Sequence, residues 1–109
     1  MTDIKIDDAM AEALNKLTID HFFLDQLFMV TTDDNDVELK VINIKELDEK
    51  FHGPNTSRLP FSVLLRSNPD IFLHQGMYRF NLDGIGELAI FIVPLGPDEK
   101  GHIHEMIFN

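Results

Sequence analysis

The fold is decided by residues 76–93, which read Gly76-Met77-Tyr78-Arg79-Phe80-Asn81-Leu82-Asp83-Gly84-Ile85-Gly86-Glu87-Leu88-Ala89-Ile90-Phe91-Ile92-Val93. In the first half, Tyr78, Phe80 and Leu82 alternate with other side chains, which is the period-two pattern of a strand that buries one face. A three-residue turn at 83–85 sets Phe80 opposite Leu88 and keeps the apolar stripes together, whereas a two-residue turn sets Phe80 opposite a glutamate. We therefore expect a hairpin with the three-residue turn, in which Gly84 or Gly86 adopts the left-handed conformation.

Four further strands are expected around this hairpin, at residues 27–32, 37–47, 59–66 and 102–108. The apolar phase slips at Ile42, which predicts a β-bulge within the strand at 37–47. Pro94 and Pro97 lack the amide hydrogen that a ladder needs, so the strand that starts at Gly86 is expected to end at Val93. Short connections and no long helix predict a mainly β fold, a single small antiparallel barrel or rolled sheet of about six strands.

A short helical segment is expected at residues 1–17, before a β domain at 18–109. Asp7 or Asp8 can cap the helix, and Met10, Leu14 and Leu17 repeat at helical spacing. Thr18 can cap one further turn through His21. Phe22 and Phe23 are then expected to reach the core.

The charge distribution excludes two classes of partner. The chain has 109 residues and a net charge of −10. Its first fifty residues hold 13 acidic and 5 basic side chains, and the remainder holds 6 acidic and 4 basic. Such a field repels phosphate backbones and anionic lipid, so we expect neither nucleic-acid nor membrane binding. The chain has no cysteine and shows no signal peptide, which indicates a soluble protein in the cytoplasm.

Several ordered motifs in the chain resemble an uncharacterised bacterial family of short β-rich proteins, a domain of unknown function. The motifs are Leu59-Pro60-Phe61-Ser62-Val63-Leu64-Leu65-Arg66, Gln75-Gly76-Met77-Tyr78-Arg79, Gly86-Glu87-Leu88 with Phe91-Ile92-Val93-Pro94-Leu95-Gly96-Pro97-Asp98, and Glu105-Met106-Ile107-Phe108-Asn109. The resemblance implies a small β domain and no defined activity, and it suggests an association with phage-tail-like or secreted structural assemblies. The chain departs from the family pattern at Gln26 and His104, where relatives often carry glycine and tyrosine.

The segment 102–105 has the most chemical character. His102 and His104 share one face of a strand and can bind a divalent metal if a neighbouring strand adds a carboxylate. The alternative is that His104 points into the core and bonds to a neighbour, while His102 is solvated beside a turn.

A ligand site could also involve Arg66, Tyr78, Arg79 and His104. Arg66 and Arg79 flank the connection 67–75 and could hold a carboxylate together, or each could pair with an acidic side chain at the surface. The serines lack the strand-turn-helix elbow of a nucleophile, so we expect no catalysis and no cofactor.

The connection 67–75 carries Ile71, Phe72 and Leu73, which form the best candidate for a protein contact. Exposed, these side chains would mark a contact surface, and buried, they would plug the end of the barrel. We expect a non-catalytic interaction or structural module that binds a protein partner or associates with itself. The competing hypothesis is a small-ligand or metal-binding barrel that uses interior His104 and Tyr78.

Overall fold

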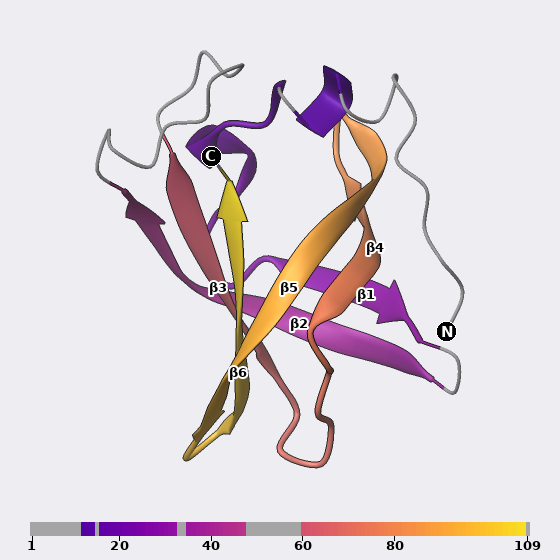
Figure 1. Cartoon of the computed structure of the whole chain (residues 1–109), viewed down its shortest axis with the longest axis vertical. Coiled ribbons are helices and arrows are strands. Elements are labelled where there is room, and N and C mark those ends of the chain that lie inside the picture. The colour runs from indigo at the N-terminus through magenta and orange to yellow at the C-terminus, as the bar shows by residue number, and fades with distance from the viewer. Residues whose placement is uncertain (1–11, 15, 33–34, 48–59, 109) are drawn as a thin grey trace.

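The computed structural model describes residues 12–14, 16–32, 35–47 and 60–108 (Figure 1). Its strands are β1 (Leu27–Thr31), β2 (Asp36–Glu46), β3 (Phe61–Ser67), β4 (Gly76–Leu82), β5 (Gly86–Asp98) and β6 (Gly101–Phe108). They form one antiparallel sheet in the order β1-β2-β3-β6-β5-β4, which curls into a nearly closed barrel. The predicted fold class is therefore confirmed.

The hairpin of β4 and β5 has the predicted register. Phe80 pairs with Leu88, Tyr78 with Ile90, and the connecting turn has three residues. Both predicted glycines take positive φ, at 80° for Gly84 and 102° for Gly86. The requirement that core side chains face one another across the ladder thus selected the correct turn.

The predicted bulge in β2 is also confirmed. The pairing of β2 with β3 shifts between Val41 and Asn43, which leaves Ile42 as the extra residue. Val41 faces the core with no exposed surface, and Ile44 resumes the inward position beyond the shift. The bulge keeps both apolar stripes inside and bends the strand, as barrel closure requires.

The predicted end of β5 at Val93 is wrong, because β5 continues through both prolines to Asp98. The pairing with β4 ends at Ile92, and the pairing with β6 takes over at Val93. Pro94 and Pro97 therefore lie where β5 has a ladder on one side only, so a missing amide hydrogen is tolerated there. The register shifts between Pro94 and Gly96, and Gly96 has a φ of 123°.

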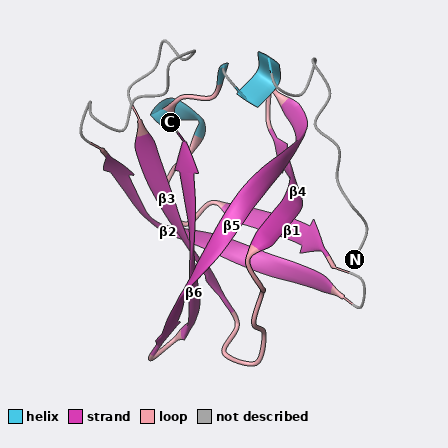
Figure 2. Ribbon diagram, viewed as in Figure 1, coloured by secondary structure: helices cyan, strands magenta, loops and turns pink. Residues whose placement is uncertain are grey.

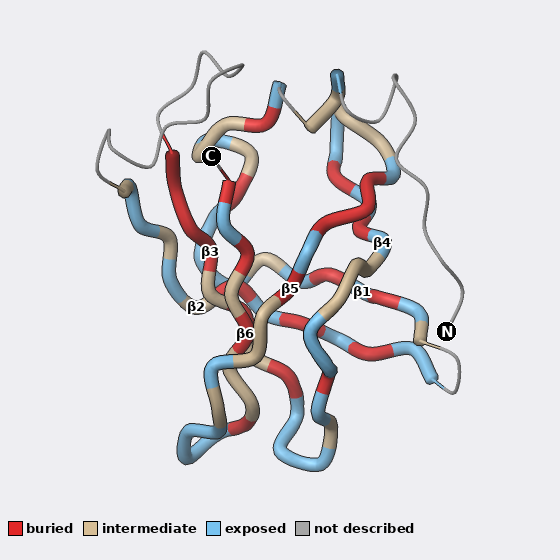
Figure 3. The backbone as a smooth tube through the Cα atoms, viewed as in Figure 1, coloured by how far each residue is buried: buried red, intermediate tan, exposed pale blue. Residues whose placement is uncertain are grey.

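Aromatic and aliphatic side chains fill the inside of the barrel. The stacked pair Phe61 and Phe108 lies with ring centroids 4.8 Å apart, and Phe22 contacts both rings. Phe28 of β1 meets the ring of Phe80 of β4 edge-on at 5.3 Å. Since β1 and β4 are the two edge strands of the described sheet, side chains close the barrel at this seam. Buried segments lie along the strands, and the lower turns are mostly exposed (Figure 3).

Two short helical segments lie at the end of the barrel opposite the β3–β4 loop (Figure 2). Residues 12–14 and 16 are helical, and Thr18 precedes the single turn η1 (Ile19–His21), as predicted. The Thr18 amide donates to His21 Nδ1 at 3.0 Å. Leu17 and Phe22 enter the core, but Phe23 is 62% exposed, so its predicted burial is wrong.

The reason is the extended backbone after η1, which points adjacent side chains in opposite directions. The predicted capping residues Asp7 and Asp8, together with Met10 and the polar loop at 48–58, lie outside the described residues.

Candidate functional site

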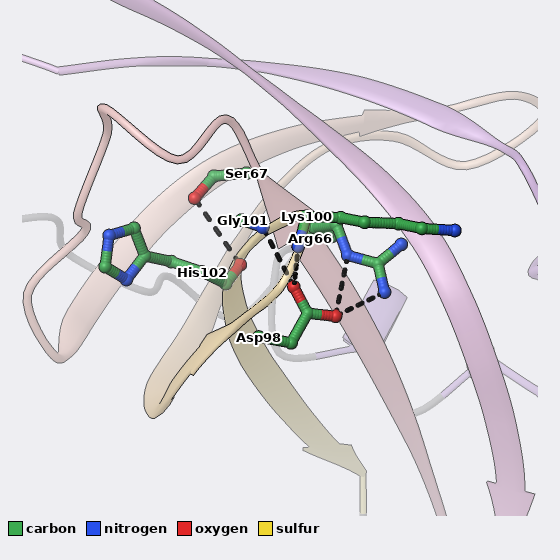
Figure 4. Close-up of polar contacts among 6 residues, drawn as sticks. All are labelled: Arg66, Ser67, Asp98, Lys100, Gly101 and His102. Atoms are coloured by element: carbon green, nitrogen blue, oxygen red, sulfur yellow. Dashed lines mark hydrogen bonds and ion pairs between the residues drawn. The ribbon is translucent and has the colours of Figure 1, made fainter.

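The candidate site lies at the end of the barrel where β3 finishes and β6 begins. Arg66 and Ser67 are the last residues of β3, and consecutive strand side chains point to opposite faces. The Arg66 guanidinium lies on the same side as the Lys100 side chain, and the His102 ring points away from both (Figure 4). One strand end therefore carries two sites, a buried inner site at Ser67 and a polar outer site at Arg66.

The inner site is a hydrogen-bonded chain that joins β6, β3 and the following loop. The Ser67 hydroxyl donates to the Ile71 carbonyl at 2.8 Å, and its oxygen lies 3.5 Å from the His102 carbonyl. His104 Nε2 lies 3.2 Å from the same hydroxyl oxygen. Since the single hydroxyl hydrogen serves the short bond to Ile71, the hydroxyl oxygen accepts from His104 Nε2–H. This bond places a proton on Nε2 of His104.

This arrangement confirms the predicted inward position of His104, which has no exposed surface. Burial lowers the pKa of His104, and the nearby charge of His102 lowers it further. The Nδ1 atoms of both histidines are buried without a hydrogen-bond partner. Among the described residues no group of three His, Cys, Asp or Glu side chains converges, so a metal would lack its third protein ligand there.

The hydrogen bond between Ser67 and His104 has a structural role. Ser67 is 2% exposed, so its oxygen does not reach a substrate. The imidazole donates to the hydroxyl and therefore does not withdraw its proton, as a general base must. The pair instead holds the start of the β3–β4 loop against β6.

The β3–β4 loop is buried in part and exposed in part, so it has features of both alternatives that the sequence left open. Leu73 is 3% exposed and Ile71 packs against the core, whereas Phe72 is 48% exposed. The Phe72 ring meets the rings of His74 and His102 edge-on, at centroid distances of 5.0 and 5.6 Å. The two aliphatic neighbours anchor the loop, and the phenyl ring between them faces solvent.

Tyr78 supports this loop from β4. Its hydroxyl donates to the His74 carbonyl at 2.8 Å, and partial burial raises the pKa of the phenol. Tyr78 is therefore partly buried at the barrel wall, where it ties β4 to the loop. Among the described residues, no hydrogen bond joins Tyr78 to His104.

The outer site pairs each arginine with its own carboxylate. Arg66 Nε donates to Asp98 Oδ2 at 3.1 Å, and Nη2 binds the same oxygen. Arg79 lies on β4 and pairs with Glu87 across the hairpin at 2.6 Å. Strands β6 and β5 separate β3 from β4 in the sheet, so the two arginines do not share a carboxylate, and the alternative of separate surface pairs holds.

Asp98 organises the turn between β5 and β6. The Lys100 and Gly101 amides both donate to Asp98 Oδ1 at 2.8 Å. The hydrogen bond from Arg66 and those from the two amides lower the pKa of the Asp98 carboxyl. A single ionised carboxylate thus fixes both the turn and the Arg66 side chain (Figure 4).

The sequence did not indicate a second group of exposed apolar side chains, which lies before and along β1. Phe23, Leu24, Leu27 and Met29 are each 58–62% exposed. The alternation along β1 could have indicated part of this group. Phe28 and Val30 fill the core, so their neighbours Leu27 and Met29 must face outward.

Comparison with known proteins gives a family without an assigned activity. A family model described as Domain of unknown function (DUF6916) matches residues 17–108. Neither the curated proteins nor the solved structures gave a match. In the part of the chain that the structure describes, no helix has the length and apolar character to cross a membrane.

Proposed function

Because the chain belongs to the family described as Domain of unknown function (DUF6916), we propose its function from its own structure: it is a non-catalytic module that binds another protein through the β3–β4 loop. The contact residue is Phe72, and Ile71 and Leu73 position it. A bacterial source, a cytoplasmic location and a role as an accessory to a larger assembly remain parts of this proposal.

One observation carries the proposal: a large aromatic side chain is half exposed on a loop that is fixed on both sides. Ser67 binds the Ile71 carbonyl, and Tyr78 binds the His74 carbonyl. Two imidazole rings support the phenyl ring itself. An aromatic residue that is ordered before binding loses little conformational entropy in a complex, which is the property of an interface hot spot.

The charge of the chain favours a partner other than a second copy. Two molecules with a net charge of −10 each repel one another, most strongly at low salt. Asp70 and Glu99 are exposed on the loop and on the β5–β6 turn. A partner with an apolar pocket and a basic rim would complement this end of the barrel.

Comparative affinity enrichment tests the proposal. The tagged chain is expressed in its native host as wild type, Phe72→Asp and Phe91→Asp, and co-purified proteins are quantified. Phe91 is the matched control, because it is 45% exposed on β5. We expect a defined protein to be enriched with wild type and Phe91→Asp and lost at least tenfold with Phe72→Asp, a loss that corresponds to about 1.4 kcal/mol. Equal enrichment by all three chains, with every variant folded, would contradict the proposal.

A metal-binding barrel is the second candidate, and the two unpartnered Nδ1 atoms of His102 and His104 favour it. A metal on these Nδ1 atoms would leave the Ser67 contact to Nε2 of His104 intact and would need a further ligand from outside the described residues. Metal analysis of untagged protein separates the candidates, because stoichiometric zinc, nickel or iron that is lost in His102→Ala would support a metal site.

A further inference from the structure

We propose that a groove on the outer face of the barrel, lined by Lys40, Arg66 and Lys100, binds carboxylate groups of an acidic segment in a partner protein. This cationic groove has a volume of about 350 Å³ and is also lined by Leu24, Asp25, Val41 and Ile42. The proposal goes beyond the contact at Phe72 and is tested without that residue.

The first argument is the placement of like charges. Lys40 of β2 lies directly opposite Arg66 of β3 in the ladder. Like charges at facing positions of two strands destabilise a sheet unless anions compensate them. Lys100 adds a third cation from the β5–β6 turn. Three of the chain's nine basic side chains therefore converge on one groove of a protein with a net charge of −10.

The second argument is that the carboxylates of the described residues compensate these cations incompletely. Asp25 Oδ1 lies 3.4 Å from Lys40 Nζ, and the Asp98 carboxylate pairs with the Arg66 guanidinium. Lys100 binds Asp98 through its backbone amide, and its ammonium group makes no ion pair with another described residue. Within the described part of the chain, two carboxylates thus pair with two of the three cations, and the charge of Lys100 is left for a ligand. Asp98 accepts from Nε and Nη2 of Arg66, and the other N–H groups of this guanidinium make no hydrogen bond to a described side chain.

The third argument concerns the kind of anion. A single excess positive charge in a short groove suits one or two carboxylates, whereas a nucleic acid needs a longer run of basic side chains to compensate its phosphates. Leu24 is 60% exposed at the groove, and Ile42, the extra residue of the bulge, lies beside it. An acidic segment that contains an aliphatic side chain fits both features, because its carboxylates meet the cations and its apolar group meets Leu24.

Amide chemical shifts of the full ¹⁵N-labelled chain test the proposal. The probe is the blocked peptide acetyl-Glu-Leu-Glu-amide, with acetyl-Gln-Leu-Gln-amide as the neutral control and inorganic phosphate as the competing anion. We expect saturable shifts at Lys40, Val41 and Lys100 with the acidic peptide. Lys100→Gln should weaken binding about threefold, the loss that corresponds to one exposed ion pair.

Lys45→Gln is the matched control, because Lys45 is exposed on the same strand and does not line the groove. This variant should bind the acidic peptide as wild type does. Equal shifts with the neutral peptide, or equal weakening by Lys45→Gln and Lys100→Gln, would overturn the proposal. Tighter binding of inorganic phosphate than of the acidic peptide would also overturn it and would assign the groove to phosphate groups.

Discussion

The buried His104 links the core to the β3–β4 loop. His104 donates through Nε2 to Ser67, which holds Ile71, the residue before Phe72. A second proton would place an unpaired Nδ1–H and a charge in the core, at the cost of desolvating that charge. The folded chain therefore favours a neutral His104.

Stability should fall as the pH drops below the ordinary pKa of histidine, about 6.5. The folded chain holds the pKa of His104 below this value, first through burial and then through the charge of His102. The unfolded chain therefore binds the proton more readily, and the stability that is present above pH 6.5 is lost as the pH falls toward the folded pKa. Urea unfolding at pH 7.5 and at pH 5.5 measures this loss.

His104→Gln keeps a donor for Ser67 and removes the titration, so this variant should lose less stability between the two pH values. His74→Gln is the control, because His74 is exposed, and its loss should match that of wild type. The Asp98 carboxyl, whose pKa is lowered from 3.8, contributes only at more acidic pH and does not disturb this window. A His104→Gln chain with the wild-type pH dependence would refute the role assigned to His104.

The inward position of His104 was predictable from its phase with Met106 and Phe108. Its partner was not, because Ser67 reaches it only through the β3–β6 ladder, which pairs strands separated by two others in sequence. Local patterns fix which face a side chain occupies. They do not fix which distant strand lies opposite.

At the scale of the element, the start of β6 is a point of close backbone approach. A Cβ atom at Gly101 would lie 1.9 Å from the Ser67 carbonyl oxygen, and neither backbone can yield without breaking the ladder. Glycine is required here for space, since its φ is not among the positive ones. The same approach brings the Gly101 amide to Asp98.

Gly101→Ala should lower the free energy of unfolding by about 3 kcal/mol or more, because overpacking against backbone has no cheap relief. Urea unfolding measures the change. Gly84→Ala is the comparison. A Cβ atom at Gly84 would have open space around it, so the only cost of a side chain there is the positive φ of 80°. The Gly84→Ala substitution should lower the free energy of unfolding by about 1–2 kcal/mol. A Gly101→Ala chain as stable as Gly84→Ala would show that the strands are not this close.

The elements themselves were largely predictable. The hairpin register and the bulge in β2 follow from keeping apolar stripes on one face, a constraint that operates within one or two neighbouring strands. The length of β5 was not predictable. Pro94 can lie within this strand only because the pairing of β5 with β4 ends two residues earlier, at Ile92 of β5. Only the arrangement of three strands shows that a donor is dispensable there.

At the scale of the whole molecule, the barrel depends on a seam between β1 and β4. These edge strands lie side by side but are not paired by backbone hydrogen bonds in the sheet. The edge-on contact between the rings of Phe28 and Phe80 joins them. Such a ring pair contributes about 0.5–1.5 kcal/mol beyond the area that it buries.

A double-mutant cycle measures the seam. Phe28→Leu, Phe80→Leu and the double variant are unfolded in urea, and the double variant should be more stable than the sum of the single losses predicts, by about 0.5–1.5 kcal/mol. Phe28→Leu combined with Phe91→Leu is the control, because Phe91 lies 45% exposed on β5, away from the core that holds Phe28, and their losses should add. Additive losses at the seam would mean that the rings do not couple the two edges.

The exposed surface was the least predictable feature. A barrel of this size has an inner face that is filled by alternate residues, and the sequence identifies that face well. The apolar residues of the outer face follow no repeating pattern. The sequence therefore did not show that Leu73 is buried while Phe72 is exposed. Their difference arises because Ser67 and Tyr78 fix the loop on either side of Phe72.

Site-specific photo-cross-linking tests the central claim most directly. A benzophenone side chain replaces Phe72 in one chain and Phe91 in another, and both are irradiated in the native host. The account predicts a covalent adduct with one defined protein from position 72 and none with that protein from position 91. Adducts of the same composition from both positions, or no adduct from position 72, would contradict the assignment of the β3–β4 loop as a protein-binding site.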